Sequence, residues 1–459
     1  MDCTRIGRRP LLAIAAVATG VLAGCGGGSG STTGESTQAS TSTGTQAAPT
    51  TSGTTTSSRP ELAKETPYPY FGRVPERTHD QPDAPNPPFH FVWTFWAHEL
   101  IEFPPAVSHG RMYVLNKTGQ LFALSTSDGK LLWKRTLGAN QTGPAYADGT
   151  VFVAQGNGTF TALDAATGKT RWVFHSPTGL QSSPLTVDGR VYFGSQGGIL
   201  YALDAGSGKV LWKSDQGAAI KASPAMHDGV VYVGDYDGNV HAVSASTGKV
   251  VWTASTDSYP GGGGFYSSPA IAFGRVYEAR ADGTLFALDV QSGHVEWYFL
   301  ATDDVYASPA TGDVKGLGPT VFIGSYDRKL YAVDGESGKQ RWTYDVGGAI
   351  PGSPTVMGDT VYTSSFDTSK TTGLDARSGK PVWEWGTAGY EPMISDGRYA
   401  FLVGYQTIWA FEPCVMRGHP NPGGEAICAL ASDLHEIGVK AQLAREDPKS
   451  SSARSGAGG

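Results

Sequence analysis

Residues 199–212 read ILYALDAGSGKVLW, and variants of this stretch recur about every 40 residues along the chain. Eight of the eleven tryptophans mark the repeat, with steps of 40, 39, 40, 40, 45, 45 and 41 residues. A period near 40 built from strand-like segments is typical of β-propellers, in which each repeat forms one blade. The marker tryptophans are Trp93, Trp133, Trp172, Trp212, Trp252, Trp297, Trp342 and Trp383.

One repeat divides into four short strands. Residues 181–187 and 190–194 flank a first turn, and residues 199–204 and 210–213 flank a second turn that contains Gly208. A glycine lies four residues before seven of the eight marker tryptophans, and glycine adopts the positive φ that a tight hairpin needs. We expect the tryptophan of each outermost strand to pack against a neighbouring blade, which is a structural role.

The number of strands predicts how the ring closes. Residues 91–96 contain Trp93 but follow no set of three inner strands, whereas residues 390–413 form three inner strands with no tryptophan strand after them. Together, the two pieces make one complete four-stranded blade. We therefore predict an all-β, eight-bladed β-propeller of four-stranded antiparallel blades, closed by the N-terminal strand pairing into the last blade. Such closure leaves no open sheet edge at the seam.

The repeat, written [FYT]-A-L-D-x-x-[ST]-G-K-x-x-W in its best copies, resembles the tryptophan-docking motif of the PQQ-like β-propellers. The resemblance covers residues 91–413 and implies a PQQ-like propeller domain with those bounds. This family includes quinoprotein dehydrogenases and BamB-type outer-membrane assembly lipoproteins. The resemblance therefore implies a fold and leaves the activity open.

Residues 1–24 are predicted to be a lipoprotein signal peptide. Three arginines precede an apolar run over residues 11–23, which is too short to cross a bilayer as a mature helix. The segment ends in LAGC at residues 22–25, which resembles a bacterial lipobox and implies cleavage before Cys25 and lipidation of that cysteine. We expect an exported, extracytoplasmic protein anchored in the cell membrane by lipid. An ordinary signal followed by a chance cysteine is the alternative.

Two segments of biased composition follow the expected anchor. Residues 26–58 hold 8 Ser, 11 Thr and 7 Gly, and such a segment buries too little apolar surface to fold. Residues 25–58 are therefore predicted to be the lipidated cysteine and a disordered tether. Residues 59–90 contain eight prolines and are expected to run as an extended linker between the tether and the ring.

Cys414 and Cys428 lie after the ring. Cys3 leaves with the signal peptide and Cys25 is the expected lipid site, so these two cysteines have only each other. An exported protein favours a disulfide between them. A metal site is the weaker alternative, because no histidine lies at ligand spacing. Residues 414–459 are predicted to comprise the disulfide loop, a short helix and a disordered tail.

Two kinds of loop share one face of a propeller: those that join consecutive blades, and those that join the second strand of a blade to its third. We expect polar and aromatic side chains from these loops to surround the mouth of the central channel, where they could hold a ligand or a peptide. A water-filled rim is the alternative. The candidate rim residues are Gln181, Lys221, Tyr266, Tyr306, Asp235, Asp237, Arg280, Asp327 and Arg328, and Glu102, Tyr326 and Pro351 are expected to point to the same mouth.

The charge balance and the absence of known catalytic motifs exclude several classes of function. The chain has 35 Lys+Arg against 42 Asp+Glu, so it offers no basic surface for nucleic acid. Motifs such as Gly-x-Ser-x-Gly and His-Glu-x-x-His do not occur, and no two cysteines are adjacent. We therefore assign no catalytic residue and no metal ligand, and we expect no cofactor. The leading prediction is a monomeric, membrane-tethered, non-catalytic scaffold that binds a protein or a cell-wall polymer.

Two alternatives come from the resemblance. A quinoprotein-type oxidoreductase would bind PQQ and calcium at the mouth, where Lys221 and Arg328 could pair with the carboxylates of the quinone. A BamB-like factor for outer-membrane protein assembly would share the anchor and the ring size, but the long tether and the Cys414–Cys428 loop depart from that compact pattern. A host without an outer membrane would exclude the second alternative.

Overall fold

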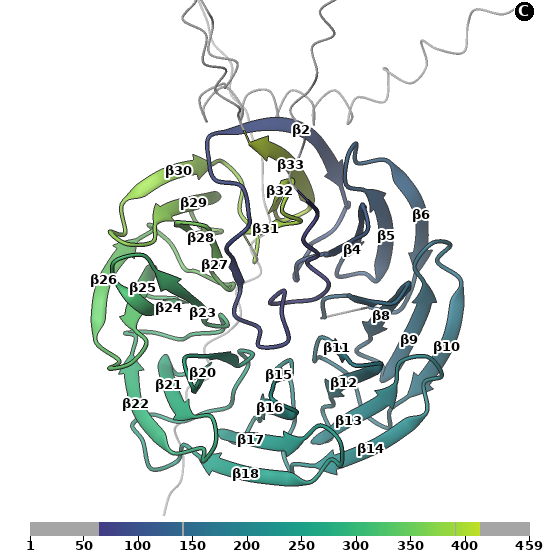
Figure 1. The fold of residues 1–459 in the computed structure, drawn as a ribbon, viewed down its shortest axis with the longest axis horizontal. Coiled ribbons are helices and arrows are strands. Elements are labelled where there is room, and N and C mark those ends of the chain that lie inside the picture. Colours follow the sequence, from purple (N-terminus) through teal and green to yellow (C-terminus); the bar gives the residue numbers. More distant parts are fainter. Residues whose placement is uncertain (1–63, 140–141, 391, 414–459) are drawn as a thin grey trace, which may run out of the picture. The chain divides into compact units, whose positions relative to one another are not determined.

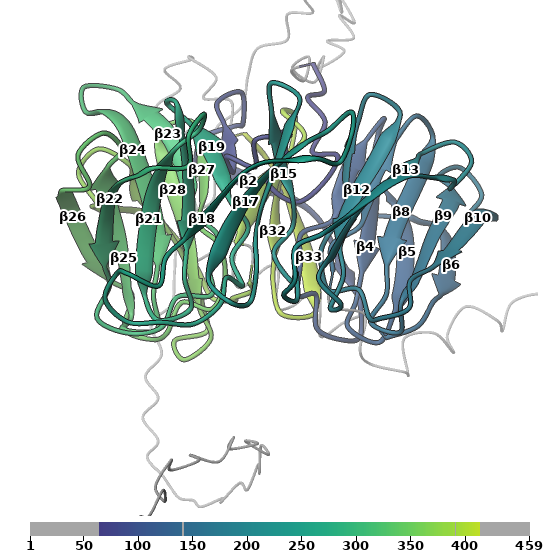
Figure 2. The same ribbon diagram turned by 90° about the horizontal axis from the view of Figure 1, so that it is seen from below.

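The computed structural model describes residues 64–139, 142–390 and 392–413. Eight sheets stand side by side around a central channel (Figure 1). Their blades are antiparallel, and one sheet gains a fifth strand, Asp80–Gln81, which pairs parallel. Viewed from the edge, the strands of each blade run between two faces on which the connecting loops lie (Figure 2). The predicted all-β, eight-bladed PQQ-like propeller is therefore confirmed.

The first four blades each contain four strands that follow one another in sequence from the channel to the rim. Blade 1 holds β3 (Ala106–Ser108), β4 (Arg111–Leu115), β5 (Gln120–Ser125) and β6 (Leu131–Thr136). Blade 2 holds β7 (Ala145–Ala147), β8 (Thr150–Ala154), β9 (Thr159–Asp164) and β10 (Thr170–His175). Blade 3 holds β11 (Leu185–Val187), β12 (Arg190–Gly194), β13 (Ile199–Asp204) and β14 (Val210–Asp215). Blade 4 holds β15 (Ala225–His227), β16 (Val230–Gly234), β17 (Asn239–Ser244) and β18 (Val250–Ser255).

The other four blades include the two that take strands from the N-terminal part of the chain. Blade 5 holds β19 (Ala270–Ala272), β20 (Arg275–Ala279), β21 (Thr284–Asp289) and β22 (Val295–Leu300). Blade 6 holds β23 (Ala310–Val314), β24 (Gly318–Gly324), β25 (Lys329–Asp334) and β26 (Gln340–Asp345). Blade 7 holds β1 (Asp80–Gln81), β27 (Thr355–Met357), β28 (Thr360–Ser365), β29 (Lys370–Asp375) and β30 (Pro381–Trp385). Blade 8 holds β31 (Met393–Ser395), β32 (Ala400–Val403), β33 (Thr407–Pro413) and β2 (Phe89–Trp96).

Blade 8 closes the ring as predicted. β2 pairs antiparallel with β33, and Trp93 lies opposite Ala410 in the register. The fourth strand of this blade thus comes from the N-terminal part of the chain, while its first three strands come from the end of the described chain. Trp93, Phe122 and Phe401 belong to one buried cluster, which joins blade 8 to blade 1. This pairing removes the open edges that an unclosed ring would leave.

Each marker tryptophan lies between its own blade and the following one. The indole Nε1 of Trp172 donates a hydrogen bond to the carbonyl oxygen of Ala205 in the next blade, at 3.0 Å. Trp93, Trp133, Trp212, Trp252 and Trp342 make the equivalent bond to the blade that follows theirs. At these positions the indole therefore adds a directional bond to the apolar packing between neighbouring blades.

The segment that precedes β2 differs from the expectation for residues 59–90. Residues 64–88 do not extend away from the ring; they lie across and within the central channel (Figure 1), which they enter and leave on the same face, and Tyr68 and Arg77 have no exposed surface there. Their carbonyl groups accept hydrogen bonds from the innermost strands of six of the eight blades, because the channel-facing edge of each such strand has amide groups to satisfy. The donors are the amides of Val107, Tyr146, Met226, Ile271, Thr311 and Val356, and the acceptors are the carbonyls of Tyr68, Pro69, Pro75, Glu76, Thr78 and His79.

Arg77 fastens this channel segment to the inner strands. Its Nε donates to the carbonyl of Pro224 at 2.6 Å, and its Nη2 donates to the carbonyls of Ser183 and Pro184 at 3.2 and 3.3 Å. Burial lowers the pKa of Arg77 to about 10, so the guanidinium remains charged at neutral pH. Carbonyl oxygens and the rings of Tyr70 and Phe71, 6.0 and 5.5 Å from the guanidinium carbon, thus surround this cation.

The two ends of the described chain lie on one face of the ring, opposite the mouth. Thr66 donates its amide to Asp396 in the turn between β31 and β32, and Phe89 pairs with Pro413 where β33 ends. Cys25, Cys414 and Cys428 lie outside the described residues, so the predicted lipid site and disulfide remain predictions. Among the residues that are described, no helix has the length and apolarity needed to cross a membrane.

Candidate functional site

A ring of serines surrounds the channel just below the mouth. Each of these residues directly precedes the proline at the start of an inner strand, and the hydroxyl of each accepts a hydrogen bond from the amide one blade earlier. Five consecutive bonds of 2.8 to 3.0 Å link six blades in this way. The amides belong to Gly143, Ser183, Ser223, Ser268 and Ser308, and the acceptors are Ser183, Ser223, Ser268, Ser308 and Ser353. Small side chains at this crowded radius therefore also hold neighbouring blades together.

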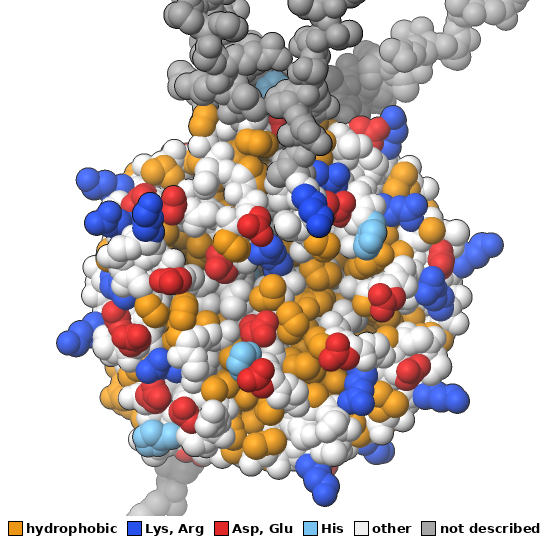
Figure 3. Space-filling view, viewed as in Figure 1, with side chains coloured by type: hydrophobic (Ala, Val, Ile, Leu, Met, Phe, Trp, Pro, Cys, Tyr) orange, Lys and Arg blue, Asp and Glu red, His pale blue; other side chains and the backbone are white. Residues whose placement is uncertain are grey.

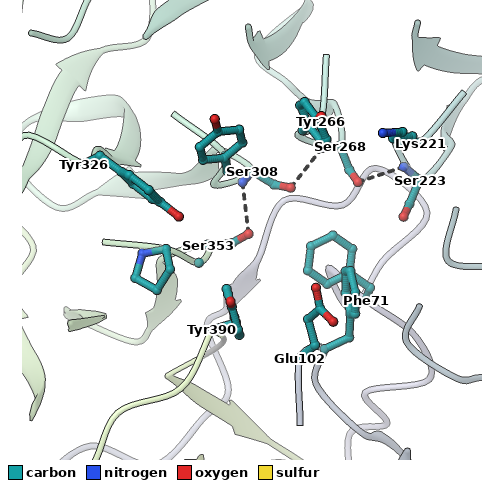
Figure 4. Close-up of a pocket in the computed structure, with 14 residues that line it drawn as sticks. Phe71, Glu102, Lys221, Ser223, Tyr266, Ser268, Ser308, Tyr326, Ser353 and Tyr390 are labelled. Carbon is teal, nitrogen blue, oxygen red and sulfur yellow. Dashed lines mark hydrogen bonds between the residues drawn. The ribbon is translucent and has the colours of Figure 1, made fainter. Parts of the chain in front are cut away.

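A pocket of about 310 Å³ opens above this ring, at the mouth of the channel (Figure 4). Phe71 of the channel segment contributes to its lining, together with side chains from the loops between blades. The aromatic members of the lining are Phe71, Phe103, Tyr266, Tyr306, Tyr326 and Tyr390. Glu102 and Lys221 are the charged side chains of the lining among the described residues. A concave pocket that combines aromatic side chains with convergent polar groups is a usual form of a binding site.

Four tyrosines form a continuous row along one side of the mouth. The rings of Tyr236 and Tyr266 are 4.8 Å apart, those of Tyr266 and Tyr306 are 5.4 Å apart, and those of Tyr306 and Tyr326 are 5.1 Å apart. All three pairs have the edge-to-face geometry that aromatic rings favour. Each ring is thereby held in place by its neighbour, so the row presents a preformed aromatic surface.

Lys221 lies over this row. Its Nζ is 4.1 Å from the ring centre of Tyr236 and 4.8 Å from that of Tyr266. Within the described part of the chain, no carboxylate lies at ion-pair distance from Lys221. Its charge is stabilised by the electron-rich faces of two rings.

Glu102 lies on another part of the wall, beside Phe71 in Figure 4. Its Oε2 is buried, and no described residue donates a hydrogen bond to it. Burial raises the pKa of Glu102, and the charge of Lys117 offsets part of this shift. Burial also raises the pKa of Tyr306 and of Tyr390 to about 12, so both phenols are neutral donors at physiological pH.

Three of the predicted rim residues serve the blades themselves. Asp235 is buried and its Oδ2 lies 2.8 Å from Nε2 of His241. Arg280 is 1% exposed, pairs with Asp282 at 2.7 Å and donates to backbone carbonyls of the neighbouring loop. Asp327 accepts hydrogen bonds from Thr302 and Tyr331. These side chains stabilise loops and do not line the pocket.

The other predicted residues divide between pocket and surface. Lys221, Tyr266 and Tyr306 line the pocket, as do Glu102, Tyr326 and Pro351. Arg328 is exposed and pairs with Asp345 at 3.3 Å. Asp237 is exposed in the turn after β16, and Gln181 is half-buried between β10 and β11. Neither of the last two residues belongs to the lining.

Sequence reasoning missed Phe71, Phe103 and Tyr390. Phe71 lies in a segment whose prolines indicated a linker, so nothing in the pattern placed it at the mouth. Phe103 and Tyr390 lie in the loops that follow and precede blade 8, each two residues before the first-strand proline. The other repeats have small residues at this position, so the two aromatic residues were an available signal that sequence reasoning did not use.

Comparisons with known proteins agree with this geometry. A family model described as "Outer membrane protein assembly factor BamB" matches residues 91–219, 139–254 and 196–413. The structure of BamB from Moraxella catarrhalis is similar, with 18% identity, a TM-score of 0.59 and coverage of 72% of this chain and 99% of that one. The quinohemoprotein alcohol dehydrogenase of Comamonas testosteroni is similar, with 16% identity, a TM-score of 0.63 and coverage of 79% of this chain and 83% of that one. At these identities the two structures share the fold alone.

Curated relatives match over short stretches only. The tetrathionate hydrolase of Acidianus ambivalens is 39% identical over 62 residues, which is 13% of this chain and 12% of that protein. The tetrathionate hydrolase of Acidithiobacillus ferrooxidans is 43% identical over 56 residues, which is 12% of this chain and 11% of that protein. The family model, by contrast, spans every blade from residue 91 to residue 413. On that match, the chain belongs to the PQQ-like β-propeller family whose model describes the outer membrane protein assembly factor BamB.

Proposed function

We propose that this protein is a non-catalytic, extracytoplasmic scaffold, held at a membrane by lipid on Cys25, that binds a segment of a partner chain in its mouth pocket. The tyrosine row with Phe71 carries the proposal. Aromatic side chains supply large contact area at a low cost in conformational entropy, and they dominate the binding energy of protein interfaces.

The position of the chain ends supports this arrangement. The described chain begins on the face opposite the pocket, where Thr66 donates its amide to the carbonyl of Asp396. A flexible tether of the predicted composition would raise the local concentration of the pocket near membrane partners. Figure 3 shows the face of the ring that carries the channel segment, opposite the mouth. Charged side chains of both signs are interspersed there, so this face offers no basic surface for nucleic acid.

The chemistry of the pocket argues against the quinoprotein alternative. A calcium ion prefers six to eight oxygen ligands that include carboxylates, and the described lining has one carboxylate, that of Glu102. The cluster of at least three acidic, histidine or cysteine side chains that would mark a metal site does not occur among the described residues. These residues do not fit a calcium–quinone pair. Dye reduction by the full chain after incubation with PQQ and calcium would test this alternative directly.

Outer-membrane protein assembly, which the description of the family model names, is the second alternative. This alternative also has a partner segment bound in the mouth pocket, and it names that partner as an outer-membrane protein. The alternative therefore predicts that the captured partner is an outer-membrane protein, whereas the broader proposal also allows other chains.

Crosslinked capture of the membrane-bound, full-length protein tests the proposal. The variant Tyr266→Ala/Tyr306→Ala should recover at least about tenfold less partner, because each anchor tyrosine of an interface contributes more than about 1 kcal/mol. Tyr298→Ala is the matched control, since Tyr298 is an exposed tyrosine on β22, at the outer rim of blade 5. Equal recovery with the double variant and with the control would contradict the proposal.

A further inference from the structure

The mouth pocket contains one carboxylate without a donor. Oε2 of Glu102 is buried, and within the described chain no side chain or amide donates a hydrogen bond to it. No described lysine or arginine lies within ion-pair distance of it, although the charge of Lys117 acts from farther away. Burying a carboxylate oxygen without a partner is unfavourable, so this wall of the pocket is incomplete without a donor from outside.

Aromatic rings surround this carboxylate. Phe103 follows it in the chain, and the rings of Phe103 and Phe71 are 5.7 Å apart in an edge-to-face contact. The charge of Glu102 contributes to the raised pKa of Tyr390, which places that phenol in its field. A cation at this place would be attracted by the carboxylate through direct ion pairing and by the aromatic rings through their quadrupoles.

Lys221 does not satisfy this carboxylate. Its ammonium group lies over Tyr236 and Tyr266 in loops of blades 4 and 5, across the ring from Glu102 in the loop between blades 8 and 1. The pocket therefore has a cation already stabilised on one side and an anion without a donor on the other.

We propose that the pocket takes the side chain of a lysine from a polypeptide partner, with its ammonium donating to Glu102 and its four-carbon stem lying against Phe71 and Phe103. This proposal rests on the proposed function and names the group that the pocket recognises. An ammonium suits the site better than a guanidinium, because the single buried oxygen offers one acceptor and a guanidinium pairs best with two.

A polypeptide also suits the shape better than an amino-sugar polymer. The cavity of about 310 Å³ is closed below by the channel segment, with Phe71 in its lining. A thin side chain can enter such a closed pocket from a chain that lies across the mouth. A sugar unit inside a polymer is joined to a neighbour on each side, so both glycosidic linkages would have to enter the pocket with it.

The test uses the full-length chain and three blocked tripeptides, Ala-Lys-Ala, Ala-norleucine-Ala and Ala-Glu-Ala, with affinities measured by calorimetry. Norleucine matches the stem of lysine and lacks the charge. We expect the lysine peptide to bind at least about tenfold more tightly than the norleucine peptide, and we expect Glu102→Gln to abolish that difference. The affinity for the lysine peptide should also fall as the pH is lowered through the raised pKa of Glu102, while the affinity for norleucine stays constant.

Several outcomes would overturn the inference. These are equal affinity for the lysine and norleucine peptides, an unchanged preference in Glu102→Gln, or tighter binding of the glutamate peptide than of the lysine peptide. Chitosan oligomers are titrated as a fourth ligand, and tighter binding of these amino-sugar chains than of the lysine peptide would overturn the inference too. Glu102→Gln should fold normally, because it replaces a buried carboxylate without a donor by a neutral group of the same shape. If capture of the membrane partner is lost in Tyr266→Ala/Tyr306→Ala but kept in Glu102→Gln, the scaffold function stands and the lysine assignment fails. If both variants keep capture, the scaffold function fails as well.

Discussion

Gly208 lies on the indole ring of Trp172 from the preceding blade, so closely that a Cβ at residue 208 would come within 2.5 Å of Cε3. The repeat glycine therefore has two roles, since it adopts a φ of +72° in the turn and leaves room for the ring. The same contact recurs for Gly129, Gly168, Gly248, Gly293, Gly338 and Gly379 with Trp93, Trp133, Trp212, Trp252, Trp297 and Trp342.

A comparison of alanine substitutions at Gly208 and Gly189 should separate the cost of the positive φ from the cost of crowding the indole ring. Gly189 lies in the other turn of the same blade with a φ of +71°, and a Cβ there would meet no atom within 4 Å. Gly189→Ala should lower the free energy of unfolding by about 1 to 2 kcal/mol, the cost of the left-handed backbone. Gly208→Ala should lower it by about 1 to 3 kcal/mol more, because the new methyl group overpacks the indole. Equal losses in urea unfolding would show that the contact with Trp172 is unimportant.

Glu278 should make stability depend on pH. Its carboxyl is fully buried on β20, and burial together with the charge of Asp235 raises its pKa well above the ordinary value. The folded state therefore holds a proton that the unfolded state has lost, and stability falls as the pH rises from about 4.3 to the raised pKa. Glu278→Gln stays neutral, so it should gain stability relative to the native chain as the pH rises.

The measurement is the melting temperature from about pH 5 to about pH 9. Each unit of pKa shift corresponds to about 1.4 kcal/mol. Glu336→Gln is the control, since Glu336 is an exposed residue in the turn after β25 and should leave the profile unchanged. A constant difference between Glu278→Gln and the native chain across this range would exclude the buried carboxyl as the cause.

Arg77 should be essential to the channel segment. Arg77→Ala removes the donor from the carbonyls of Ser183, Pro184 and Pro224, and we expect a loss of about 2 to 5 kcal/mol in unfolding free energy. Arg73→Ala is the control, because Arg73 lies in the same segment, also has a positive φ, and contacts Asp80 and Asp83 near the surface. If both variants melt at the same temperature, the channel segment does not depend on Arg77.

The predicted attachment to a membrane depends on lipidation of Cys25. Cys25→Ala should move the protein from the membrane pellet to the supernatant after cell fractionation, because one lipidated cysteine is the only anchor that we predict. Cys3→Ala should leave the protein in the pellet, since residue 3 belongs to the predicted signal peptide. Retention of the Cys25→Ala protein in the pellet would refute the lipid anchor.

The repeat made the ring predictable from sequence. Tryptophan and glycine stand at fixed positions because each blade must dock on the next in the same way, so the periodicity reports contacts between blades as well as turns. The same logic located the N-terminal strand, since Trp93 had no blade of its own.

The channel segment was not predictable, because its contacts are not periodic. Eight prolines among residues 59–90 indicated an extended linker, but the described part of this segment turns repeatedly, is largely buried and is hydrogen-bonded to the inner strands. Two predicted rim residues, Asp235 and Arg280, do not line the pocket for a related reason. Both are polar and near the mouth, but Asp235 bonds to His241 on β17 and Arg280 to the carbonyl of Thr256, and these contacts arise only in the folded ring.

A photo-crosslinking amino acid at position 306 tests the central claim most directly. With p-benzoylphenylalanine in place of Tyr306 in the full-length, membrane-bound protein, irradiation should yield a discrete adduct with a partner chain. The same group in place of Tyr298, on the outer rim, should yield none. No adduct from position 306, or equal adducts from both positions, would contradict a binding site at the mouth of the ring.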